Sequence, residues 1–187
     1  EGATYQEIAA RGGGILNSAK ALQGMSEDQL YEEAAQRVRH AMSQGVGAME
    51  IKSGYGLTLE AERKMLRVVA RLKEAMPIPI RATFLGCHAV PPGFEDAAAY
   101  TRHVAEVMLP ALAGEGLVDF VDVFCEKGYF GVAETKVILE AAKATEASVR
   151  RCLRRSAWSE SIRFDWKIIS STSFSFSYGM LASEWQS

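Results

Sequence analysis

The amino-acid sequence alternates between two hydrophobic patterns. Apolar residues recur at helical spacing in five stretches, and the second begins with a capping box in which Ser26 and Gln29 can each bond the other's backbone N–H. Short apolar runs with the character of buried strands lie between the later stretches. The predicted helices span residues 1–11, 26–44, 59–75, 96–113 (bent near Pro110) and 133–144, and the predicted strands span 46–52, 80–86 and 120–125.

Strand, loop and helix follow one another three times between residues 46 and 144. This alternation predicts an α/β fold with a parallel sheet and helical crossovers, and the lengths of the units suit a (β/α)8 barrel. In such folds ligands bind at the carboxyl ends of the strands. Three polar or glycine-bearing loops are therefore expected to converge on one face: 53–56, 87–88 and 126–129.

The composition changes after about Thr145. All three tryptophans lie beyond that point, as do ten serines between Ser156 and Ser187. We therefore expect residues 1–144 to form the partial barrel and residues 145–187 to form a divergent tail, which a frame shift or disorder would explain. Within this tail, polar and aromatic residues alternate over 170–178, a pattern typical of an edge strand or of an aggregation-prone segment.

Charge and cysteine usage narrow the class of protein. A formal charge of −2 argues against a dedicated nucleic-acid or polybasic membrane surface, and no apolar run approaches the ~20 residues of a membrane span. Three widely spaced cysteines fit a reducing compartment, so a cytoplasmic protein is expected. The start of the chain has no signal-peptide pattern, and the missing initiator Met suggests a chain cut from something longer.

Tyr55 and His88 are the main candidates for chemistry. Tyr55 lies between two glycines, which let a backbone approach a ligand closely, so its phenol could bind a carboxylate or a carbonyl; a tight turn with an exposed tyrosine is an equally good interpretation. His88 follows a strand and could be a metal ligand, an acid–base or a hydrogen-bond donor, or be satisfied by local backbone. His40 and His103 are expected on solvated helix surfaces.

Charged residues at the strand ends are weaker candidates. Lys52, beside Glu50, could be carboxylated and bridge two metals, although a structural ion pair is favoured. Glu126 and Lys127 follow the third strand in the equivalent place and could support a site, again with an ion pair favoured. Cys125 is expected to be an inert core thiol.

No HxH, HExxH, EF-hand or Walker motif is present in the sequence. Two runs nevertheless resemble the imidazolonepropionase family of the amidohydrolase superfamily: Glu-Ile-Lys-Ser-Gly-Tyr-Gly at 50–56 and Gly-Cys-His-Ala-Val-Pro-Pro at 86–92. Shorter matches follow in the order of that family between residue 2 and about residue 144, at 2–5, 12–15, 64–68, 83–86 and 121–126.

The resemblance implies a hydrolase of histidine degradation that opens the ring of 4-imidazolone-5-propanoate to N-formimidoyl-L-glutamate. Its fold would be a metal-dependent (β/α)8 barrel, of which this chain holds about strands 2–4 together with an atypical tail. Tyr55 would contact the substrate and the product, and His88 would hydrogen-bond the imidazolone. The substrate would be a small molecule, with neither nucleic acid nor membrane as a partner, and the full-length family implies a homodimer.

The resemblance assigns no metal ligand and no catalytic residue to this chain. The zinc or iron(III) of the family would be held by an HxH pair that belongs upstream of Glu1 and by residues on strands that belong after Ala144. Two other interpretations stay open. The chain could belong to another cyclic-amide or deaminating amidohydrolase, because the same barrel serves many chemistries. It could also be a decayed fragment that keeps the family's sequence but has no catalytic activity. Tyr55 and His88 are expected to face the same cavity, near enough to touch one small ligand, because they follow parallel neighbouring strands ~4.8 Å apart.

Overall fold

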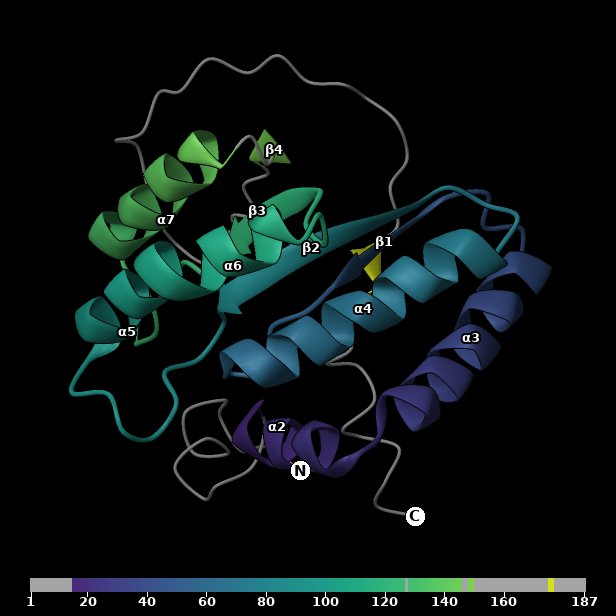
Figure 1. Ribbon diagram of the computed structural model, residues 1–187, viewed down its shortest axis with the longest axis horizontal. Helices are drawn as coiled ribbons and strands as arrows, with labels where there is room; N and C mark the ends of the chain where they lie inside the picture. Colours follow the sequence, from purple (N-terminus) through teal and green to yellow (C-terminus); the bar gives the residue numbers. More distant parts are fainter. Residues whose placement is uncertain (1–14, 127, 146–147, 150–174, 177–187) are drawn as a thin grey trace.

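The computed structural model describes residues 15–126, 128–145, 148–149 and 175–176 of the chain (Figure 1). Helices alternate with strands, and the helices cover one face of a sheet. No helix in the described ranges is long and apolar enough to cross a membrane. The elements are α2 (Ile15–Gly24), α3 (Glu27–Ser43), β1 (Met49–Lys52), α4 (Leu59–Ala75), β2 (Ile80–Cys87), α5 (Ala97–His103), the π-helix η1 (Val104–Met108), α6 (Leu109–Gly114), β3 (Phe120–Val123), α7 (Val132–Ala144), β4 (Ser148–Val149) and β5 (Ser175–Phe176).

The sheet is parallel and its strands lie in the order β4-β3-β2-β1-β5. Lys52 of β1 lies opposite Thr83 of β2, and the register between β2 and β3 shifts between Phe84 and Cys87. The predicted α/β class and parallel sheet are confirmed. The pairing also continues past residue 144, because β4 adds two residues beside β3. An edge strand was one interpretation of 170–178, and two residues of that run, β5, pair with β1.

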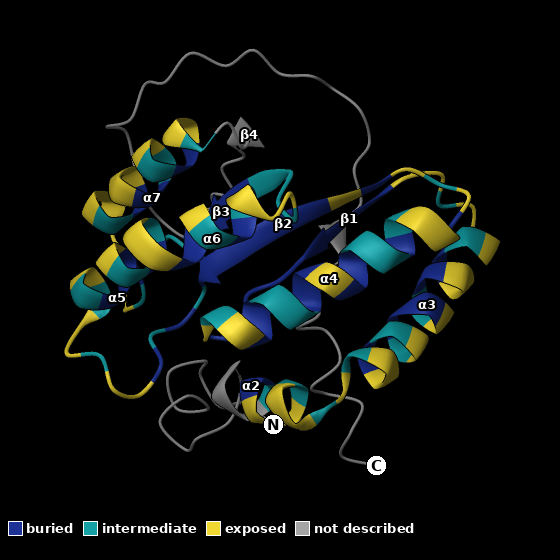
Figure 2. Cartoon of the chain, in the orientation of Figure 1, coloured by how far each residue is buried: buried dark blue, intermediate teal, exposed yellow. Residues whose placement is uncertain are grey.

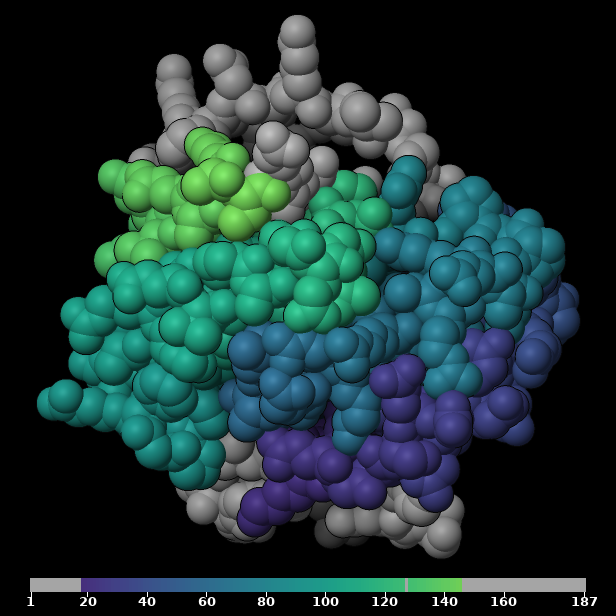
Figure 3. All heavy atoms as spheres, viewed as in Figure 1, coloured from purple at the N-terminus to yellow at the C-terminus, as the bar shows by residue number. Residues whose placement is uncertain are grey.

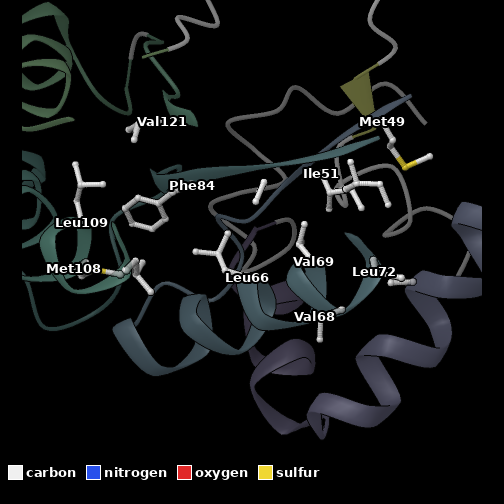
Figure 4. Packing of buried hydrophobic residues seen from close by; sticks show 14 of the residues in the cluster. Met49, Ile51, Leu66, Val68, Val69, Leu72, Phe84, Met108, Leu109 and Val121 are labelled. Carbon is white, nitrogen blue, oxygen red and sulfur yellow. The ribbon is translucent and has the colours of Figure 1, made fainter. Parts of the chain in front are cut away.

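The hydrophobic core lies between the sheet and the helices. Ile51, Phe84 and Val121 come from three neighbouring strands and belong to one buried cluster with Leu66 of α4 and Leu109 of α6 (Figure 4). Buried residues line the sides of the helices that face the sheet, and exposed residues lie on the opposite sides (Figure 2). Burial of one such side chain contributes about 1.5–3 kcal/mol, so this layer holds the helices and strands together.

Capping residues in the sequence determine where several helices begin. Ser26 Oγ accepts from the Gln29 N–H at 3.1 Å and Gln29 Oε1 accepts from the Ser26 N–H at 2.9 Å, so the predicted capping box is confirmed. The helix predicted over 59–75 has those bounds in α4, where Thr58 is the N-cap. The predicted helix at 1–11 lies outside the described residues, and α2 was not predicted. In Figure 3 α2 packs directly against α4.

The helix predicted over 96–113 is continuous but changes type twice along its length. Asp96 caps α5 by accepting from the Ala99 N–H at 2.7 Å, and η1 then separates α5 from α6. The π-helical turn lies just before Pro110, near which a bend was expected. A proline has no N–H to donate and its ring would clash with the carbonyl four residues earlier in a regular α-helix, so a wider turn at this place suits the proline.

Two strands are shorter than predicted. Val46 does not begin β1, because its N–H bonds the Ala41 carbonyl at the end of α3, where Gly45 has a φ of +91°. The third strand ends at Val123 instead of residue 125. Cys125 therefore lies half-buried in the loop after the strand, and the prediction that it belongs to an apolar strand is wrong.

We predict that Gly86→Ala destabilises the fold by about 1–3 kcal/mol, because it overpacks the end of β2. A Cβ at this position would lie 2.4 Å from Cζ of the buried Phe84 ring. Urea unfolding of the variant measures the loss. Gly47→Ala is the matched control, because a Cβ there meets nothing within 4 Å. An unfolding free energy of Gly86→Ala equal to that of the control would contradict the prediction.

Candidate functional site

The loops after β1 and β2 bring Tyr55 and His88 into contact. The centroids of the two rings are 4.8 Å apart, in an edge-to-face arrangement. Tyr55 is 8% exposed and His88 is half-buried. The two side chains are therefore close enough to touch one small ligand, as expected from two parallel neighbouring strands. Their roles in binding, and the cavity they were expected to share, stay predictions.

The loop after β3 reaches the same place. The Phe124 ring lies 5.4 Å from the His88 ring and 4.9 Å from the Tyr129 ring, both edge-to-face. The three loops thus meet through Tyr55, His88 and Phe124. Sequence reasoning missed Phe124, because its apolar character placed it inside the predicted strand.

The Tyr55 loop is held by a buried carboxylate on α4. Glu62 is fully buried, and its two oxygens accept hydrogen bonds from the backbone N–H groups of Gly54, Gly56 and Leu57 at 2.7–3.0 Å. Sequence reasoning missed Glu62. The signal was a glutamate on the apolar stripe of an amphipathic helix, four residues before Leu66.

Two further side chains join the loop to its surroundings. The Tyr100 hydroxyl, buried on α5, lies 3.2 Å from the Gly86 carbonyl and 3.4 Å from the Leu57 carbonyl. The Gln23 amide on α2 donates to the Gly56 carbonyl at 2.8 Å. The loop after β1 is thus attached to the end of β2 and is covered by α2, with Ala19 of that helix in the same small apolar cluster as Tyr55.

His88 is neutral near pH 7. Burial lowers the pKa of His88 to about 4. A backbone hydrogen bond at Gly54 and the negative charge of Asp122 oppose this shift, and the positive charge of Lys52 adds to it. A neutral imidazole has one donor nitrogen and one acceptor nitrogen. Nδ1 is buried beside the Gly54 backbone. His88 can therefore offer a hydrogen bond to a ligand that carries no compensating charge.

Lys52 lies in a buried ion pair. Its Nζ is 2.5 Å from Asp122 Oδ2 and 3.8 Å from Glu50 Oε1. Glu50 Oε1 also accepts from the Thr83 hydroxyl at 2.7 Å. The favoured interpretation of Lys52 as a structural ion-pair residue fits this geometry, with Asp122 as the shorter contact that sequence reasoning did not name.

The remaining candidate residues lie away from Tyr55 and His88 or have structural contacts of their own. The Glu126 backbone closes a turn, donating to the Phe130 carbonyl at 3.2 Å, and Lys127 lies outside the described residues. His40 is exposed, whereas His103 is half-buried against Phe94, with ring centroids 5.3 Å apart. Burial raises the pKa of the Cys87 thiol to about 12 and makes it unreactive.

The described residues do not fit a metal ion. Across 15–126 and the shorter described ranges, no group of three or more His, Cys, Asp or Glu side chains is arranged to hold one. A catalytic zinc site needs about three protein ligands. The contact between Tyr55 and His88 does place a phenol and a neutral imidazole, two hydrogen-bonding groups, side by side.

We predict that His88 makes the fold less stable in acid. Between pH 6.5 and pH 4 the unfolded chain binds a proton at His88 that the folded chain does not, so the stability present above pH 6.5 falls as the pH falls toward 4. The loss from this residue reaches about 3 kcal/mol at most. Urea unfolding at pH 7 and pH 4.5 measures it. His88→Gln should flatten this dependence and the exposed-residue control His40→Gln should not; equal slopes in all three proteins would refute the assignment.

The chain is similar in sequence to proteins named imidazolonepropionase. No protein-family model matches the chain. It is 52% identical over 143 residues to the imidazolonepropionase of Christiangramia forsetii, covering 76% of this chain and 35% of that protein. It is 55% identical over 141 residues to that of Flavobacterium johnsoniae, covering 75% and 34%. The chain spans about a third of the length of the curated relatives it matches. The resemblance to imidazolonepropionase is therefore confirmed over about three quarters of this chain.

Proposed function

We propose that this chain supplies the Tyr55–His88 part of an imidazolonepropionase, a hydrolase that opens the ring of 4-imidazolone-5-propanoate to N-formimidoyl-L-glutamate in histidine degradation. The observation that carries the proposal is the contact between Tyr55 and His88, at a centroid distance of 4.8 Å, in a chain 52% identical to an enzyme of that name. An aligned stretch of 143 of the 187 residues must include both positions.

We propose that the fold is part of a (β/α)8 barrel, about strands 2–4 with their helices. Two observations support this. The strands β1, β2, β3 and β4 are parallel and lie beside one another in chain order, as consecutive barrel strands do. Their helices lie on one side of the sheet, and the polar side chains of Glu50, Lys52, Thr83 and Asp122 belong to the strands' other face, which would line the barrel.

In this proposal the two residues bind and polarise the substrate. The neutral His88 imidazole donates an N–H to the ring carbonyl oxygen and steadies the negative charge that develops there. The Tyr55 phenol bonds a carbonyl or a carboxylate of the substrate and of the product. The family's zinc or iron(III), when bound, supplies hydroxide near neutral pH. Since the described residues do not fit that ion, no part in holding it is assigned to them.

The same barrel serves other amidohydrolases, so another cyclic amide or a deaminated base is the second candidate substrate class. The lack of a fitting metal site among the described residues favours a further proposal, that the chain by itself is non-catalytic. The family also suggests a cytoplasmic homodimer in the full-length enzyme.

The roles of Tyr55 and His88 can be tested in a chimera. Residues 2–144 of this chain replace the matching segment of the full-length Flavobacterium johnsoniae protein, and turnover of 4-imidazolone-5-propanoate is compared with that of a hydantoin and of guanine. We expect Tyr55→Phe and His88→Ala each to lower kcat/KM about tenfold or more, because each loses a substrate hydrogen bond, and to leave bound metal unchanged. Tyr31→Phe and His40→Ala are the controls. Loss of metal in His88→Ala would show that its role is wrongly assigned.

The 187-residue chain alone should neither hold the catalytic metal nor turn over the substrate. The physical reason is the missing set of about three ligands among the described residues. Elemental analysis for zinc and iron, together with loss of 4-imidazolone-5-propanoate, measures both. Stoichiometric metal with turnover above background would overturn this expectation.

A further inference from the structure

Glu62 is an unusual carboxylate, because it is fully buried and bonds backbone amides in place of a cation. Oε1 accepts from the N–H groups of Gly56 (2.7 Å) and Leu57 (3.0 Å), and Oε2 accepts from that of Gly54 (2.9 Å). Burial raises the pKa of Glu62, and hydrogen bonds from the Ser53 side chain and from these three amides oppose the rise. Charge-assisted bonds of this kind are roughly twice as strong as neutral ones.

The three amide donors lie on both sides of Tyr55. Gly54 precedes Tyr55 in the sequence, and Gly56 and Leu57 follow it, so one carboxylate fixes the backbone before and after this residue. The backbone of the loop is also strained. Leu57 has a φ of +59°, a conformation that costs a residue with a side chain about 1–2 kcal/mol. Bonds to Glu62 offset that cost and select this conformation of the loop.

The loop fits closely between α4 and the end of β2. A Cβ at Gly54 would lie 2.7 Å from the Leu85 carbonyl oxygen and 3.2 Å from His88 Nδ1, and a Cβ at Gly56 would lie 2.6 Å from the Glu62 nitrogen. The backbone on either side of Tyr55 therefore has little room to shift. In this conformation the Tyr55 ring lies against His88.

We propose that Glu62 is a positioning residue: its carboxylate holds the loop at 53–57 so that the Tyr55 phenol stays against His88 in the geometry that receives the substrate. The part that concerns substrate rests on the proposed function; the part that concerns the loop does not. Glu62 itself touches neither the substrate nor the reacting atoms in this proposal. It acts through Tyr55.

The loop is tested in the full 187-residue chain by NMR. In Glu62→Gln, one carboxylate oxygen becomes an NH2 group that cannot accept from a backbone N–H. We expect faster hydrogen exchange at Gly56 and Leu57 and loss of the nuclear Overhauser contacts between Tyr55 and His88, while contacts between Ile51 and Ala82 in the sheet persist. Glu60→Gln, whose side chain is 82% exposed, is the matched control. Glu62→Asp keeps the charge on a shorter side chain, so its hydrogen-exchange rates at Gly56 and Leu57 should lie between those of Glu62→Gln and Glu60→Gln. A Tyr55–His88 contact that survives in both Glu62→Gln and Glu62→Asp would overturn the proposal.

The role of Glu62 in substrate binding is tested in the chimera with a double-mutant cycle that combines changes at Glu62 and Tyr55. Glu62→Gln should raise KM for 4-imidazolone-5-propanoate about tenfold and change kcat less than about threefold, because Tyr55 binds substrate and product alike. In a Tyr55→Phe background the same change should raise KM less than about twofold. Equal effects in both backgrounds would mean that Glu62 acts on the fold in general, and would overturn the proposal. An unsubstituted chimera without turnover would instead count against the proposed function, and the NMR comparison would still decide the role of Glu62 in the loop.

Discussion

Parallel strands that share hydrogen bonds must end at the same edge of a sheet, and the candidate site depends on this constraint. β1, β2 and β3 all run in one direction, so the residues that follow them emerge together although they are far apart in sequence. The direction of the strands alone therefore brings Tyr55, His88 and Phe124 to the same edge of the sheet, where their rings are in contact. The specific contacts, from Glu62 and Tyr100, then select one loop conformation among those that the strand ends allow.

The same pairing brings charges together inside the protein. A parallel sheet is ordinarily buried on both faces, so polar residues on its strands must satisfy one another. Lys52 and Asp122 do so across two strand spacings, with Glu50 and Thr83 completing the group. Removing Lys52 would take the one positive charge from this group, and truncating one partner of a buried ion pair costs about 3–5 kcal/mol. Burial is the main reason that His88 is neutral, because it outweighs the Gly54 backbone hydrogen bond and the Asp122 charge, which both favour the imidazolium.

Sequence predicted what depends on neighbours along the chain and missed what depends on neighbours in space. The capping box at Ser26 and the bounds of α4 have local causes, and both were predicted. Tyr55 and His88 could be paired because strand order alone determines which loops meet. The ion pair with Asp122 could not, because its partner lies 70 residues away in the chain and alternation in an apolar strand does not reveal which side chain faces it. The short strand β4 was missed for a similar reason, since two residues carry too little pattern.

The contacts that position Tyr55 and His88 lie within one compact part of the chain. Glu62 is on the helix that joins β1 to β2, Tyr100 is on the next helix, and Gln23 is on a helix that precedes β1. These contacts use backbone groups of the loop after β1 and of the end of β2 as partners, and they need no ion to form. The substrate-contacting half of the proposed enzyme can thus be built by local packing, whereas a metal centre would need side chains from beyond the described residues. The two halves of the proposed site therefore have separate physical causes.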